Sequence, residues 1–169
     1  CGYPPEWWAP FPREKAYSWE ILPQDANEGE VILSKRTELG ILSNFANTPF
    51  EFEGRTYASL EGFWQMMKYP DPELKKDPRS NPSLTWSFTR NEVAALSGFP
   101  AKEAGNAAKE NYEKIGISWI SYRGKKIDYK GRDQDKHYEL ILRATRENIA
   151  QNKNARDILL ATEGLILSP

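Results

Sequence analysis

Residues 59–69 carry an apolar pattern that leaves little choice of secondary structure. The pattern consists of Leu60, Phe63, Trp64 and Met67. These positions follow one another at i, i+3, i+4 and i+7, a spacing that places their side chains on one face of an α-helix. Ser59 stands at the N-cap position, and Pro70 ends the segment and opens a polar loop, rich in proline and lysine, that runs to Pro82. The sequence therefore predicts a helix over residues 59–69.

Hydrophobic periodicity predicts further helices and two β-hairpins. The helices are expected at residues 90–96, 101–115, 135–151 and 155–162. Residues 50–57 alternate around Gly54, and residues 118–129 alternate around Gly124, as in β-hairpins. Residues 30–34 are predicted to form a short strand, and we expect a small antiparallel sheet in this part of the chain. The expected fold class is α+β, mainly helical, with small antiparallel β-hairpins.

The length of 169 residues is typical of one globular domain, and no internal repeat divides it. We expect this domain at residues 30–169, preceded by an N-terminal arm at residues 1–29 that is rich in proline and tryptophan. Five prolines up to residue 23 prevent a regular helix in the arm. Its aromatic residues are expected to clamp the arm onto the domain, and this interpretation is favoured over an aromatic binding site.

Composition narrows the chemistry that this chain can support. One cysteine and one histidine exclude an internal disulfide framework and a metal site built on several cysteines, so no metal site is expected. The formal net charge of -1 argues against a globally basic surface, and we expect no strong binding to duplex DNA. The sequence contains no glycine-rich phosphate loop, nucleophile elbow or HExxH motif, which removes three common enzyme classes.

Two expectations concern the location of the protein. No apolar run reaches the roughly 20 residues that a membrane-spanning helix requires, so we expect no membrane span and a cytoplasmic location. The chain begins with Cys1-Gly2 instead of methionine, as would remain after cleavage of a bacterial lipoprotein signal. The alternative is therefore a protein that is lipid-anchored through Cys1.

Three polar side chains share one face of the predicted helix at residues 59–69. Glu61, Gln65 and Lys68 fall within about 60° of one another on a helical wheel. A carboxylate, a carboxamide and an amine can together act as general acid or base, orient a polar substrate and attack as a nucleophile. The same spacing is also common on solvated helix faces. His137 has no second histidine or cysteine at ligand spacing and is interpreted as structural.

Two other segments contain candidate ligand-binding residues. Ser43 and Asn44 lie in a turn-forming stretch after an apolar pair, where they bind a ligand or only cap the turn. Residues 114–132 contain six basic residues against one acidic residue. The candidates there for binding a substrate phosphate are Lys125, Lys126 and Arg132. A hairpin with solvated lysines is the alternative for this segment.

Two blocks of the chain carry an extended order of residue types. The first comprises Leu42-Ser-Asn-Phe45, Pro49-Phe50, Gly54, Tyr57, Ser59, Glu61, Gln65 and Lys68. The second lies between residues 138 and 162 and includes Arg143, Ala144, Gln151 and Leu159-Leu-Ala-Thr162. This order resembles the signature of the NADAR (YbiA-like) family, over roughly residues 30–165. The resemblance implies a single YbiA-like domain.

The resemblance also implies an N-glycosidase. Members of the family are implicated in releasing ADP-ribose from a modified guanine base, or in hydrolysing riboflavin-pathway intermediates that carry a ribosylamine phosphate. Carried over to this chain, Glu61 and Lys68 would be catalytic, without a metal or other cofactor. The substrate-binding residues would be Ser43, Asn44, Phe45, Tyr57, Trp64 and Gln65. The partner would be an ADP-ribose-containing small molecule or an ADP-ribosylated nucleic acid. We expect Glu61, Gln65 and Lys68 to line one pocket with Asn44.

Two departures from the family pattern bear on activity. Many relatives have a lysine at the position of Asn148, and the chain stops at Pro169 where the family usually continues with a segment containing tryptophan and glycine. We therefore expect either a truncated C-terminus or a member that differs there. The alternative function is a catalytically inactive module that binds ADP-ribose or a nucleotide.

Overall fold

The computed structural model describes residues 3–34 and 38–168, so the prediction of a lipid anchor at Cys1 lies outside the described residues. The helices are α1 (Leu60–Met66), α2 (Arg90–Ala94), α3 (Gly98–Ile115), α4 (Gln134–Gln151) and α5 (Lys153–Ala161). The strands are β1 (Glu30–Ile32), β2 (Phe50–Phe52), β3 (Arg55–Tyr57), β4 (Ile120–Tyr122), β5 (Lys125–Ile127) and β6 (Ile166–Ser168). The mixed class of helices and short hairpins is confirmed. Within the described ranges, none of the helices is long and apolar enough to pass through a bilayer.

Helix α1 begins where the sequence predicts it and ends earlier than expected. The Ser59 hydroxyl accepts a hydrogen bond from the Gly62 amide at 2.9 Å and donates one to the Leu96 carbonyl at 2.8 Å. The helix stops at Met66, although the pattern predicts that it continues to residue 69. Pro70 has no N–H to donate to the Met66 carbonyl, which therefore accepts from Tyr69 in a tighter turn.

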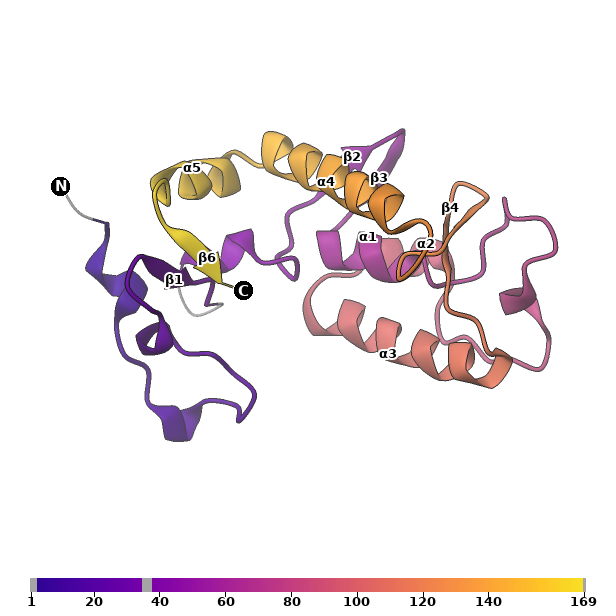
Figure 1. The fold of residues 1–169 in the computed structure, drawn as a ribbon, viewed down its shortest axis with the longest axis horizontal. Helices are drawn as coiled ribbons and strands as arrows, with labels where there is room; N and C mark the ends of the chain where they lie inside the picture. The colour runs from indigo at the N-terminus through magenta and orange to yellow at the C-terminus, as the bar shows by residue number, and fades with distance from the viewer. Residues whose placement is uncertain (1–2, 35–37, 169) are drawn as a thin grey trace.

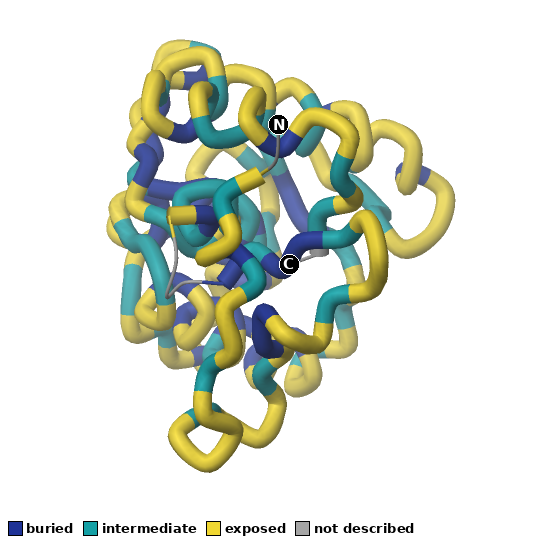
Figure 2. The backbone as a smooth tube through the Cα atoms, turned by 90° about the vertical axis from the view of Figure 1, so that its left-hand side faces the viewer, coloured by how far each residue is buried: buried dark blue, intermediate teal, exposed yellow. Residues whose placement is uncertain are grey.

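Two clusters of buried apolar side chains hold the chain together. The larger cluster surrounds α1 and is built by α2, α3, α4 and the two hairpins. The smaller cluster consists of Trp7, Val31 and Leu39, with Ile158 and Leu165 packed against it. Figure 1 shows the arm, β1 and β6 at one end of the molecule and α1 to α3 at the other. Helix α5 lies at the end that holds β1 and β6, and α4 continues from it toward α1. The buried segments lie in the interior, behind the exposed outer turns (Figure 2).

The pairing of the strands corrects one expectation. Strands β2 and β3 form an antiparallel hairpin, as do β4 and β5, which confirms the two predicted hairpins. Strand β1, predicted within an antiparallel sheet, pairs in parallel with β6, with Glu30 opposite Ile166. Two parallel strands must be joined by a long crossover connection. The partner of β1 lies at the far end of the chain, so the sequence pattern around β1 could not predict it.

The arm forms three short 3-10 turns, Pro5–Trp8, Arg13–Lys15 and Pro23–Asp25, and no α-helix in its described part. Clamping is confirmed for Trp7, whose buried indole donates a hydrogen bond to the Glu38 carboxylate at 2.7 Å. Tyr17 and Trp19 behave differently, because they keep 63% and 60% of their surface exposed. One part of the arm therefore anchors it, while another presents aromatic rings to solvent.

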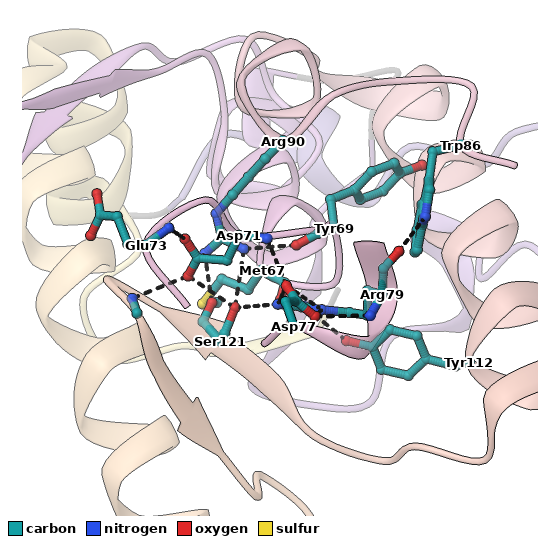
Figure 3. A network of polar contacts seen from close by, with 11 residues as sticks. Met67, Tyr69, Asp71, Glu73, Asp77, Arg79, Trp86, Arg90, Tyr112 and Ser121 are labelled. Carbon is teal, nitrogen blue, oxygen red and sulfur yellow. Dashed lines mark hydrogen bonds and ion pairs between the residues drawn. The ribbon is translucent and has the colours of Figure 1, made fainter. Parts of the chain in front are cut away.

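A buried ionic network fixes the polar loop that follows α1 (Figure 3). Arg79 is fully buried and pairs with Asp77 at 2.9 Å. Its guanidinium also donates to the Met67 carbonyl at 2.9 Å and to the Ser121 hydroxyl at 2.6 Å. Burial acts to raise the pKa of the Asp77 carboxyl, but the hydrogen bonds from Arg79 outweigh it and leave that pKa below its ordinary value.

Arg90 extends the same network from α2. It donates to the Tyr69 carbonyl at 3.0 Å and to the Ser121 carbonyl at 2.6 Å, and it lies 3.7 Å from the Asp71 carboxylate. The two arginines thus bind the carbonyls of Met67 and Tyr69, the residues on either side of Lys68. Since the Ser121 amide also donates to the Met67 carbonyl, strand β4 is part of this clamp.

Replacing Arg79 tests how much the network stabilises the fold. Arg79→Met should lower the free energy of unfolding by about 3–5 kcal/mol, because it leaves the Asp77 carboxylate buried without its counter-charge. Urea unfolding followed by circular dichroism measures the change. Because the folded pKa of Asp77 is below its unfolded value, the difference from wild type should shrink as the pH falls below about 4.

Arg13→Met is the matched control, since it removes an ion pair to Asp25 that is exposed on the arm. Its unfolding transition should barely move. Equal unfolding midpoints for the two variants would contradict the role assigned to Arg79.

Candidate functional site

Glu61 and Gln65 form a hydrogen-bonded pair on the face of α1 that looks toward α3. The Gln65 amide nitrogen donates to the Glu61 carboxylate at 2.8 Å, and Gln65 is only 7% exposed. Its carbonyl oxygen Oε1 is buried and has no hydrogen-bond partner. This oxygen is enclosed against α3, and a buried acceptor left unsatisfied is energetically costly.

Gly105 on α3 makes room for this pair. A Cβ atom at position 105 would lie 2.1 Å from the Gln65 Oε1 atom, so any larger residue would displace the carboxamide. The buried residues of α3 around it are small and recur at helical spacing: Ala101, Ala104, Gly105 and Ala108. This run of small residues is the sequence signal that α3 can approach α1 closely. The prediction of the site from the sequence did not include it.

Lys68 lies in the turn that follows α1, where its amide donates to the Gln65 carbonyl at 3.1 Å, and it is partly buried. Its ammonium group sits 4.8 Å from the centroid of the Trp64 ring. Burial lowers the pKa of Lys68, and the positive charges of Lys130 and Lys109 lower it further, while the Glu61 carboxylate opposes them. The environment therefore favours the neutral amine more than water would.

The Trp64 ring is packed among other rings on the α4 side of α1. It lies 5.2 Å from the Tyr129 ring and 4.9 Å from the His137 ring, centroid to centroid. Burial lowers the pKa of His137, and its buried Nε2 atom has no hydrogen-bond partner. These neighbours hold Trp64 in place beneath Lys68. Among the residues described, no group of three or more His, Cys, Asp or Glu is placed to hold a metal ion.

The Ser43–Phe45 loop connects this face to a neighbouring cleft. The Asn44 carbonyl accepts a hydrogen bond from the Glu61 amide at 2.9 Å, and the Phe45 carbonyl accepts one from the Gly98 amide at 2.8 Å. Ser43 and Phe45 line a cleft of about 690 Å³ that also involves the 3-10 helix Glu38–Leu42 and helix α5. Asn44 is exposed, and its main-chain carbonyl is the group that contacts Glu61.

The structure does not bring Tyr57 to this face. Its ring packs against Phe63 at a centroid distance of 4.8 Å, and Phe63 lies on the opposite side of α1 from Glu61. Tyr57 instead lines a separate cavity of about 250 Å³ together with Arg90. Burial raises the pKa of the Tyr57 hydroxyl, which has no hydrogen-bond partner.

The predicted phosphate-binding residues lie on or just after the second hairpin. Lys125 and Lys126 are exposed on β5, where the Lys126 ammonium sits 4.5 Å from the Trp119 ring centroid. Arg132 is exposed and lies 4.0 Å from Asp133. A role in phosphate binding stays a prediction for all three residues. Within the same basic segment, the positive charge of Lys130 contributes to the lowered pKa of Lys68.

Asn148 is buried and anchors α4 to a neighbouring segment. Its side-chain amide donates to the Thr48 carbonyl at 2.7 Å and to the Thr48 hydroxyl at 2.9 Å. These bonds tie α4 to the segment that leads into β2. Asn148 therefore has a structural role in this chain.

Comparison with known proteins gives one distant relative. The chain is 28% identical over 126 residues, which are 75% of this chain and 69% of the relative, to an uncharacterized 17.1 kDa protein of the Gp30-rIII intergenic region of Enterobacteria phage T4. No family model matches the chain. No solved structure matches it either.

The influence of Glu61 on Lys68 can be measured directly. Glu61→Gln should lower the pKa of Lys68 further, because it removes the charge that favours the ammonium form. NMR titration of the lysine side-chain methylene signals measures this pKa. Glu113→Gln, at an exposed position of α3, should leave it unchanged. The same Lys68 pKa in wild type and Glu61→Gln would show that the two charges do not interact.

Proposed function

We propose that this protein is an N-glycosidase of the NADAR (YbiA-like) type. Its substrate would be the N-glycosidic bond of an ADP-ribosyl or ribosylamine-phosphate compound, with ADP-ribosylated guanine as the leading candidate. The observation that carries the proposal is the Glu61–Gln65 pair, with its unpartnered Gln65 oxygen, on the same face as a partly buried Lys68. Perturbed titratable groups beside unsatisfied polar atoms are typical of functional sites.

Glu61 is assigned the central role in bond cleavage. When the ribosyl C–N bond breaks, positive charge develops at the anomeric carbon, and a carboxylate next to that carbon stabilises it. The base leaves with a proton taken from solvent, a water molecule adds to the anomeric carbon and gives a proton to Glu61, and Glu61 then returns that proton to solvent. The hydrogen bond from the Gln65 amide nitrogen orients the carboxylate.

Lys68 has two possible roles in this scheme. In the covalent route, its neutral amine attacks the anomeric carbon, the base departs and the sugar ring opens to give an imine. Water then hydrolyses the imine, which frees the sugar and restores the amine. In the direct route, the ammonium group only binds a hydroxyl or phosphate oxygen. The lowered pKa of Lys68 supports the covalent route, since that route needs the neutral form.

A release assay separates the enzyme from a binding module. The protein is incubated with an oligonucleotide that carries ADP-ribosylated guanine, and free ADP-ribose is measured by mass spectrometry. We expect release by the wild type and a fall of about 10²- to 10⁴-fold in turnover for Glu61→Gln, with binding largely kept. Glu113→Gln should retain full turnover. Wild-type protein that shifts the oligonucleotide in a gel without releasing ADP-ribose would be a binding module, contrary to this proposal.

Variants of Lys68 distinguish the two routes. Lys68→Arg keeps the positive charge, but a protonated guanidinium is a poor nucleophile. If the lysine is covalent, Lys68→Arg should lose nearly as much turnover as Lys68→Ala, and borohydride added during turnover should trap a sugar on the wild type only. If Lys68→Arg keeps most of the activity and no adduct forms, the covalent route is wrong and direct hydrolysis assisted by Glu61 remains.

A further inference from the structure

An exposed pair of stacked aromatic rings projects from the N-terminal arm. The rings of Tyr17 and Trp19 are nearly parallel, with an interplanar angle of 8° and a centroid distance of 5.3 Å. Both residues keep most of their surface exposed, whereas Trp7 of the same arm is fully buried. Trp19 also contacts the Phe99 ring of α3 edge-on, at a centroid distance of 6.4 Å, but most of both exposed rings remains uncovered. Large exposed aromatic rings that gather in one place indicate a binding surface.

The pair stands beside a second cleft and a positive charge. The cleft, of about 440 Å³, is lined by Tyr17 and Trp19 from the arm, and by Ser43, Phe45 and Phe99 from the domain. The Lys102 ammonium, on α3, lies 5.4 Å from the Trp19 ring centroid. Aromatic rings with a neighbouring lysine form the usual platform for an unpaired nucleobase, because the ring stacks on the base while the cation attracts its phosphate.

The two clefts and the Glu61 face meet at one loop. Ser43 and Phe45 line both the cleft of about 440 Å³ and the cleft of about 690 Å³. Between them, the Asn44 carbonyl accepts the hydrogen bond from the Glu61 amide. The loop at residues 43–45 therefore borders both clefts and contacts the main chain of Glu61.

We propose that Tyr17, Trp19 and Lys102 form a nucleobase-binding subsite of the substrate site. This inference rests on the proposed function, because it assigns a second binding region to the same nucleotide substrate. The base would be either the adenine of the ADP-ribosyl group or an unpaired base next to the modified guanine. Both present a flat ring with an attached phosphate, which is the chemistry that the platform recognises.

The subsite is tested by binding, without any need for turnover. The probes are AMP, followed by calorimetry, and a fluorescein-labelled single-stranded oligo(dA), followed by fluorescence anisotropy. Trp19→Ala should weaken binding of at least one probe by about 5- to 150-fold, the range for loss of one stacked base. Trp19→Phe should restore most of the affinity. A loss confined to oligo(dA) identifies a flanking base, and a loss for AMP identifies the adenine.

Matched controls keep the result interpretable. Tyr138→Ala removes an aromatic side chain of α4 that is 69% exposed, and it should bind both probes like the wild type. Ribose 5-phosphate, which has no base, should bind wild type and Trp19→Ala equally. The subsite is overturned if Trp19→Ala binds AMP and oligo(dA) as tightly as the wild type, with an unchanged urea midpoint to show that it is folded. Binding that depends on Trp19 in a protein without hydrolytic activity would refute the proposed function and leave the subsite standing.

Discussion

Two buried arginines hold the main chain on either side of Lys68. Arg79 binds the Met67 carbonyl, Arg90 binds the Tyr69 carbonyl, and both reach Ser121 of β4. Desolvating two guanidinium groups is costly, and the cost is offset only because carboxylates, carbonyls and a hydroxyl surround them. Such a network specifies one arrangement of the polar loop, and it holds the main chain on both sides of Lys68 just after α1 ends.

The two sides of α1 pack against different parts of the protein. Phe63 and Met66 face the larger apolar cluster, while Glu61 and Gln65 face α3. Because α3 carries a glycine opposite Gln65, the helix packs directly against the Gln65 carboxamide. The Glu61 carboxylate is hydrogen-bonded to this carboxamide, and its charge also acts on the partly buried Lys68 amine.

Local patterns predicted the helices and hairpins well, because apolar spacing, caps and glycine turns are properties of neighbouring residues. Helix α1 and its Ser59 cap followed from these patterns alone, although the helix ends at Met66, before Lys68. The parallel partner of β1 did not, since it depends on residues at the other end of the chain. Nor did the burial of Arg79, because residues 70–82 have the composition of a solvated loop. Burial of the site is equally a tertiary property, since it depends on how closely α3 approaches α1.

The central claim is that the substrate binds on the Glu61–Gln65–Lys68 face of α1. The most direct measurement is an NMR titration of isotopically labelled protein with ADP-ribose, followed at the side-chain amide of Gln65 and the side-chain signals of Lys68. Binding on this face predicts that both sets of signals shift together and saturate with a single dissociation constant, since both side chains would lie close to the bound ligand. Saturable shifts confined to other regions, such as the cavity beside Tyr57 and Arg90, with Gln65 and Lys68 unmoved, would contradict the claim.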